Sequence, residues 1–342
     1  HPLSDKFAVG LSLTSNFGLS TQYPDSYVAG TLGGKTEMIT GNLNLNGAYR
    51  LNEHFSFGLG VNAVYAKAKV IRKAGDLYDV ANDALGGMAG DLGLSRASEV
   101  ANLKGDDWGY GWNIGLLYEL DENNRFGLSY RSRVKIKFNG DYKNDLPVKY
   151  DKLTHLLTEA GLPPTGGETW SGRLNLTLPD IWEFSAWHKV APKWAVHYGI
   201  MYTQWRTFEE LHATGGPDNG TLFYKYEGFN DNIRVALGTT YDYSKDLTLR
   251  AGIAFDDSAA PNKSRSISIP DQDRLWLTAG ANYKFTPNTS VDLGIAYMQG
   301  FKVNFTEPAG KNNLQLAGKD VAYDFTAKGH ALLYSMNFNY TF

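Results

Sequence analysis

The chain has 342 residues, 42% of them hydrophobic, with a formal net charge of −3 and no cysteine. The lack of cysteine excludes disulfides and thiolate chemistry, and the balanced charge gives no reason to expect a nucleic-acid partner. No stretch approaches the ~18 consecutive apolar residues that a transmembrane helix needs, so helical membrane spans are excluded as well.

Strict two-residue alternation of apolar and polar residues predicts β-strands along the chain, for example over 55–65, 126–138, 247–256 and 274–285. Many of these segments have about ten residues, whereas strands of soluble proteins usually have about 5–6. Aromatic residues concentrate near the segment ends, as the interfacial girdles of a membrane barrel require: Trp194, Tyr202, Tyr241, Tyr297 and Tyr340. The pattern therefore predicts an all-β fold, a transmembrane antiparallel β-barrel.

The connections between the predicted strands alternate between two lengths. Short polar turns are expected at 51–54, 121–124, 189–193, 243–246 and 286–289. Long segments lie between them, at about 20–34, 73–106, 140–170, 207–228, 257–268 and 302–323. Short periplasmic turns and long outside loops are typical of outer-membrane barrels. We therefore predict a single barrel domain over 1–342 with about twelve strands, the first starting near Phe7.

Two of the long loops have a helical period instead. Leu77, Val80, Ala81, Ala84, Leu85 and Met88 recur at helical spacing, and so do Leu153, Leu156, Leu157 and Ala160. The second helix is expected to end at Gly161, before Pro163 and Pro164. These amphipathic helices could pack only against each other, or they could form an apolar groove on the outside of the molecule.

The last segment alternates as a closing strand. Leu332, Tyr334, Met336, Phe338, Tyr340 and the terminal Phe342 fall on one side of it. This arrangement resembles the signal read by the outer-membrane assembly machinery, which is therefore an expected partner. It points to the outer membrane of a Gram-negative bacterium.

Basic residues alternate over 125–137. We predict that Arg125, Arg131, Arg133, Lys135 and Lys137 face the lumen and form a network with acids such as Glu119 and Asp256. Attraction of anions along the lumen is the alternative role for this ladder.

Several strings resemble the FadL-type long-chain fatty acid transporters: NLNLNGAYRLNEHFSFGLGVNAVYAKAKV (42–70), GWNIGLLYELDENNRFGLSYRS (111–132), RVALGTTY (234–241), and RAGIAFDDS followed by RSISIPDQDR (250–274). The resemblance runs from about Phe7 to Phe342 and weakens in the outside loops. It implies a fourteen-strand barrel plugged by a small N-terminal hatch.

The hatch, its Asn-Pro-Ala motif and the first two strands are missing from this chain. An open twelve-strand sheet would expose edges that lipid cannot satisfy. We expect the missing part to be outside the chain shown, removed, or supplied elsewhere. The chain opens at His1-Pro2 without a secretory signal, so this N-terminus is not expected to be that of the gene product.

The resemblance also implies a carboxylate-binding pair, Arg72 and Lys225. An arginine holds a carboxylate through two parallel hydrogen bonds, and a lysine adds a point charge. Alternation places Arg72 on the lumen side. Asp256 resembles an acidic position that matters in the family, with a possible lumen or gating role shared with Arg274. Arg274 or Arg250 could instead simply neutralise it.

Residues 13–19 resemble the kinked strand of the family, where a break in the wall lets substrate leave sideways into the membrane. Ser15, Asn16 and Gly18 are the expected lateral opening, because small residues suit a bulge or a break. An ordinary glycine-containing strand end is the alternative.

The resulting hypothesis is a passive, monomeric transporter that takes up long-chain fatty acids or similar hydrophobic compounds and is embedded in the lipid bilayer. No cofactor, metal or catalytic group is expected, because the seven histidines are scattered and there is no Gly-x-Ser-x-Gly elbow. Uptake of aromatic hydrocarbons is one alternative. A surface receptor or adhesin that uses the outside loops is another.

Overall fold

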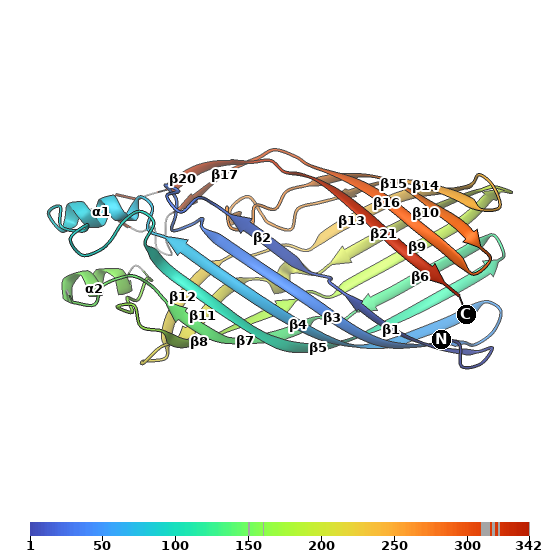
Figure 1. The fold of residues 1–342 in the computed structure, drawn as a ribbon, viewed down its shortest axis with the longest axis horizontal. Coiled ribbons are helices and arrows are strands. Elements are labelled where there is room, and N and C mark those ends of the chain that lie inside the picture. Colours follow the sequence, from blue (N-terminus) through green and yellow to red (C-terminus); the bar gives the residue numbers. More distant parts are fainter. Residues whose placement is uncertain (150, 160, 309–314, 317–318, 321, 342) are drawn as a thin grey trace.

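The computed structural model describes residues 1–149, 151–159, 161–308, 315–316, 319–320 and 322–341. It shows an elongated antiparallel β structure (Figure 1). Helices α1 (Leu77–Ala84) and α2 (Asp151–Glu159) lie at one end, which we call the loop end. Short turns and both chain termini lie at the other, the turn end. Among the described residues, no helix is long and apolar enough to cross a membrane.

One sheet contains seventeen strands. They are β1 (Phe7–Thr14), β2 (Gly18–Gln22), β3 (Lys35–Arg50), β4 (Phe55–Lys73), β5 (Glu99–Asp121), β6 (Asn124–Arg131), β7 (Val134–Lys143), β8 (Trp170–Leu178), β9 (Ile181–Ala191), β10 (Trp194–Thr203), β11 (Glu210–Gly215), β12 (Gly220–Tyr226), β13 (Asn232–Asp242), β14 (Leu247–Asp256), β15 (Arg274–Thr286), β16 (Thr289–Gly300) and β21 (His330–Tyr340).

The smaller elements lie outside this sheet. Strands β17 (Val303–Pro308) and β20 (Ala322–Ala327) form a hairpin, and β18 (Gln315–Leu316) pairs with β19 (Lys319–Asp320). A short 3-10 helix, η1 (Trp205–Thr207), follows β10. Of the predicted closing strand, β21 is described to Tyr340, and Phe342 lies outside the described residues.

The prediction of an all-β fold is confirmed. Hydrogen bonding divides the sheet into seventeen strands, whereas alternation predicted about twelve. Three of the predicted strands are each interrupted, and the structure describes them as the pairs β1 and β2, β6 and β7, and β8 and β9. The segment 207–228, predicted as a loop, adds the hairpin β11–β12. In the described part of the chain, β1 and β2 pair with β3, and β21 pairs with β16. The sheet is therefore not closed on itself.

The register separates the two faces of the sheet. Leu11, Leu45 and Val61 lie across from one another on β1, β3 and β4, and all three are exposed apolar residues. Asn44 and Asn62 face each other on the opposite side, where they are hydrogen-bonded. We call the first side the outer face and the second the lumen face, because such barrels turn an apolar band to lipid and a polar interior to the lumen.

The interruption between β6 and β7 exchanges the two faces. Arg131 of β6 lies opposite Asn113 on the lumen face, whereas Asn139 of β7 lies opposite Asp106 on the outer face. An extra residue at a break moves every following side chain to the other side. The predicted lumen positions of Arg133, Lys135 and Lys137 are therefore wrong, since these residues lie on the outer face. Arg125 and Arg131 are on the lumen face, as predicted.

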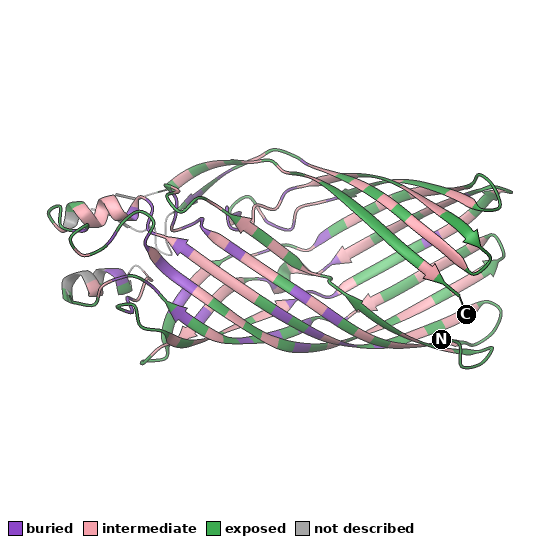
Figure 2. Cartoon of the chain, in the orientation of Figure 1, coloured by how far each residue is buried: buried purple, intermediate pink, exposed green. Residues whose placement is uncertain are grey.

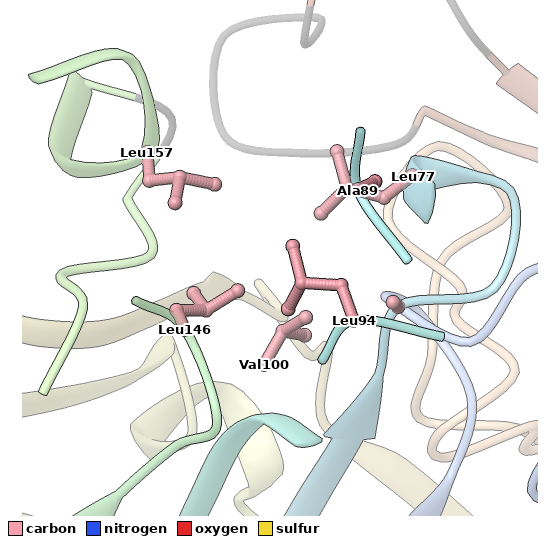
Figure 3. Packing of buried hydrophobic residues seen from close by; sticks show 7 residues of the cluster. Leu77, Ala89, Leu94, Val100, Leu146 and Leu157 are labelled. Atoms are coloured by element: carbon pink, nitrogen blue, oxygen red, sulfur yellow. The ribbon is translucent and has the colours of Figure 1, made fainter. Parts of the chain in front are cut away.

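The two loop helices are present and contribute to one apolar cluster (Figure 3). Leu77 of α1 and Leu157 of α2 join Leu94, Val100 and Leu146 there. The cluster favours packing of the two loops against each other over an open groove. Ala160 and the side chains of Leu153 and Leu156 lie outside the described residues. Many of the buried residues lie toward this end of the molecule and along β3 to β5 (Figure 2).

Candidate functional site

Arg72 lies near the loop end of β4, on the predicted lumen face, and is 3% exposed. One guanidinium nitrogen donates to the carbonyls of Lys35 (3.3 Å) and Ile71 (2.9 Å) and to the Thr36 hydroxyl (3.1 Å). The other donates to the Ser268 hydroxyl at 2.9 Å. All these acceptors are neutral, so they fix the side chain without cancelling its charge.

Lys225, on β12, forms an ion pair with Glu307. Glu307 belongs to β17 and is 2% exposed, and its second oxygen accepts a hydrogen bond from the backbone N–H of Ile267 at 2.9 Å. The hairpin β17–β20 thus places a carboxylate on the cation that was predicted to bind substrate. Glu307 is not among the site residues predicted from the sequence, and no local motif marks it.

A second buried glutamate completes the group. Glu227 is fully buried, and neither of its carboxyl oxygens accepts a hydrogen bond from a described residue. Its pKa is raised to about 7, chiefly by burial and also by the nearby Glu307 carboxylate, while the charges of Lys225 and Arg72 oppose the shift. The structure therefore brings together the predicted pair and two carboxyl groups, all within electrostatic reach of one another. Glu227 is only two residues from Lys225, a spacing that could have suggested it.

Apolar side chains adjoin these charges. The Phe223 ring lies beneath the Arg72 guanidinium, whose carbon is 5.7 Å from the ring centroid. Phe223 also lines a cavity with Val70, Leu103, Leu174 and Leu211. A cation next to an apolar cavity can hold an amphiphile, because the tail leaves water while the head group keeps a charged partner.

The lumen face changes character about halfway along the sheet. Toward the loop end, Val64, Ala66, Val134, Ile136, Phe138 and Leu178 form a buried apolar cluster. Toward the turn end, Asn42, Asn44, Asn62 and Asn113 form a hydrogen-bonded network of side-chain amides, with N···O distances of 2.8–3.0 Å. Val64 and Asn62 are consecutive lumen residues of β4, so the change takes place over one position.

The segment predicted as a lateral opening is a break between β1 and β2. Thr14 pairs with Asn42 and Gly18 with Ile39, so three residues on one strand face two on the other. The Phe17 backbone bonds to the Thr40 hydroxyl instead of to a strand. Ser15, Asn16 and Gly18 are exposed there.

Phe17 also places the break at the height of the change in polarity. It lines a small cavity with Asn42, Asn62, Val64 and Leu178, members of both the asparagine network and the apolar cluster.

Asp256 and Arg274 form a separate network. They face each other across β14 and β15, 3.1 Å apart, and Arg234 and Asn232 also contact the Asp256 carboxylate. Arg250, the alternative neutralising residue, pairs with Asp292 instead. The arrangement neutralises Asp256, and a gating role for this pair stays a prediction.

Comparison with known proteins places the chain in a family. The family model described as outer membrane protein transport protein (OMPP1/FadL/TodX) matches residues 1–342. A long-chain fatty acid transport protein of Escherichia coli O6:H1 is 52% identical over 348 residues, which cover all of this chain and 75% of that protein. Outer membrane protein P1 of Haemophilus influenzae is 43% identical, over all of this chain and 73% of that protein.

A solved FadL homologue of Pseudomonas aeruginosa aligns over 99% of this chain and 76% of its own, with a TM-score of 0.82 and 21% identity, and supports the fold. The Ralstonia pickettii toluene transporter TbuX aligns over 99% and 79%, with a TM-score of 0.63 and 15% identity. The FadL-type resemblance predicted from the sequence is thus confirmed: the chain belongs to the OMPP1/FadL/TodX family of outer membrane protein transport proteins.

Proposed function

We propose that this protein carries long-chain fatty acids, or hydrophobic compounds like them, through the outer membrane without an energy source. Substrate is captured at the outside loops, held by its head group near Arg72 and Lys225, and released sideways at the break between β1 and β2. Relatives that cover the whole chain at about half identity are named long-chain fatty acid transport proteins, which supports the substrate class.

The observation that carries the proposal is the change of the lumen from apolar to polar at the height of the strand break. A hydrocarbon chain that moves on from the apolar cluster would meet the asparagine network. Each methylene group left in a polar, hydrated space costs about 0.8 kcal/mol. Leaving through the wall at Ser15 and Asn16 avoids that cost, because the lipid outside is as apolar as the cluster inside.

Release through a wall presupposes that the rest of the wall is continuous. Unpaired strand edges are costly in lipid, since each unsatisfied backbone group costs several kcal/mol there. We therefore propose that both edges of the sheet are paired in the membrane and that the protein is a monomeric closed barrel. The exposed apolar side of β21, with Tyr334, Met336 and Phe338, is the surface we assign to the outer-membrane assembly machinery.

The head-group site is tested with a matched pair of ligands. Replacing Arg72 and Lys225 together by Ala should weaken binding of a fatty acid far more than binding of its methyl ester. Hydrogen bonds to charged groups contribute roughly 1.5–3 kcal/mol each, so a loss on the order of tenfold or more per contact is expected for the acid.

Titration calorimetry in detergent measures both ligands, and Lys189→Ala with Lys193→Ala at the turn end is the control. Equal losses for acid and ester would show that the pair does not recognise the carboxylate. Unchanged acid binding would remove these residues from the site.

A further inference from the structure

The outer face of β4, β5 and β7 near the loop end carries a group of lysines that we call the lysine face. Their side is fixed by the register, starting from Val61 on the outer face. Val61 pairs with Trp112, and further along the same two strands Lys67 pairs with Asp106 without a bulge between the two pairs. Asp106 pairs in turn with Asn139 of β7, so all of these positions are on the outer face. Among the described residues, none of these lysines has an ion-pair partner. The lysine face consists of Lys67, Lys69, Lys104, Lys135 and Lys137.

Two of these lysines face each other directly. Lys69 of β4 and Lys104 of β5 occupy paired positions, and like charges directly opposite are destabilising. Three acids occupy paired positions on this face. Glu37 faces Lys69 but forms an ion pair with Lys35, and Asp106 faces Lys67 but accepts a hydrogen bond from the Tyr65 hydroxyl at 2.9 Å. Asp141 faces Lys104, so the five lysines still outnumber the carboxylates. The protein therefore tolerates a local excess of positive charge that an external anion would relieve.

On β4 the lysine face begins where an apolar band of membrane height ends, and on β7 it extends down beside that band, because Lys135 lies next to Gly109 of β5. From Phe55 to Tyr65, β4 climbs roughly 25 Å along the barrel axis, at about 3.3 Å per residue and a tilt of about 40°. The lipid-facing band of such barrels is about 25 Å tall and is bounded by aromatic girdles. Tyr65 packs against Trp108 with ring centroids 5.3 Å apart, and Lys67 is the next outer residue beyond Tyr65.

The opposite wall is built from shorter strands. β13, β14 and β15 have 11, 10 and 13 residues, against 19 in β4 and 23 in β5. Their outer residues near the loop-side ends are uncharged and apolar, namely Ile233, Val235, Phe255, Leu275 and Leu277. Lys69 and Lys104 thus lie further along the wall than these three strands reach.

We propose that the lysine face binds the phosphate groups of phosphorylated lipids in the outer leaflet. Ammonium groups at headgroup height attract anionic lipid, and the apolar residues below them receive the acyl chains. The exposed rings of Trp108 and Tyr110 lie beside Lys135 and Lys137, where they can contact the glycerol or sugar part of a lipid. The inference rests on one part of the proposed function, namely that the loop end of the protein faces the outside of the cell. It does not depend on which substrate is transported.

The test measures lipid bound to the detergent-solubilised full chain by native mass spectrometry. The probes are lipid A with its phosphates and the same lipid after dephosphorylation. The test variant is Lys69→Gln with Lys104→Gln, Lys135→Gln and Lys137→Gln. The control removes as many cations at the turn end, by Lys189→Gln, Lys193→Gln, Lys245→Gln and Lys284→Gln.

The unchanged protein and the control should retain phosphorylated lipid, and the test variant should bind it on the order of tenfold or more weakly. Equal retention of the two lipids by the unchanged protein would overturn the proposal, whatever the variants do. Equal losses in test and control variants would also overturn it, because net charge and not this face would then be responsible. Should the fourfold variant fail to fold, Lys69→Gln with Lys104→Gln carries the same comparison.

Discussion

Glu227 is the residue at which the chemistry of the site can change with pH. Its pKa is raised to about 7, chiefly by burial. Below that pH Glu227 is neutral, so Arg72 and Lys225 outnumber the Glu307 carboxylate by one charge. Above it Glu227 is ionised and the charges balance. The attraction of the site for an anionic head group should therefore fall as the pH rises through about 7.

We predict that an alkyl sulfonate, which stays ionised throughout, binds roughly five- to tenfold more weakly one pH unit above this pKa than one unit below it. Between these two pH values the ionised fraction of Glu227 rises from about a tenth to about nine tenths, and a charge nearby in a buried site is worth at least ~1.4 kcal/mol. Glu227→Gln should bind with the affinity of the low-pH form at both pH values. Titration calorimetry checks this, with the exposed Glu168→Gln as the control. An unaltered pH profile in Glu227→Gln would assign the dependence to another group.

The residues of this site differ in how far the sequence could predict them. The lumen position of Arg72 follows from strand alternation, because β4 runs without interruption from Phe55 to that position. The partner of Lys225 could not be found in this way, since Glu307 is 82 residues away and reaches it through a hairpin between loops. Both cations, moreover, were proposed from a family resemblance and not from local physics.

The interrupted strands set the limit of prediction at the level of elements. Alternation located most of the long strands but missed the hairpin β11–β12, and it could not show that an extra residue at Ser132–Arg133 exchanges the faces of β7. Val134, Ile136 and Phe138 are apolar, and they would suit a lipid-facing side as well as the buried lumen side that they occupy. Only the pairing with β5 and β8 decides between the two sides.

The break between β1 and β2 leads to a prediction about release. Ser15→Arg, in the complete protein, should block uptake of labelled oleate by cells that lack their own transporter, because a long charged side chain would fill the gap. The barrel should still assemble and bind fatty acid. Heat-modifiable gel mobility verifies folding, and Ser20→Arg, an equally exposed position in the paired part of β2, is the control.

Normal uptake by a folded Ser15→Arg variant would mean that substrate leaves by another route, most simply along the lumen. Loss of uptake in both variants would point to a general effect of added charge on this strand pair and not to a gap at the break.

At the scale of the whole molecule, the two faces of the wall should meet different solvents. Trp112 lies on the outer face and is 46% exposed, whereas Trp187 lies on the lumen face and packs against the Arg125 guanidinium. We predict that brominated lipid quenches the fluorescence of Trp112 and spares Trp187. In bilayers, Trp112→Phe should remove a quenched component, and Trp187→Phe an unquenched one. The reverse result would invert the proposed assignment of the faces.

The extra residue at Ser132–Arg133 determines which face of the sheet every following residue of β7 occupies, much as an inserted base shifts a reading frame. Deleting one residue there would leave the composition of β7 unchanged, yet it would transfer Lys135 and Lys137 to the lumen and Ile136 to the lipid. Single-residue deletions should therefore be far more harmful at this point than substitutions of the same residues. The break between β8 and β9, at Pro179–Asp180, lies beside this one, because β6 pairs with β9 and β7 pairs with β8. A second deletion at Pro179–Asp180 is therefore the change that could bring the faces of β8 back into agreement with those of β7.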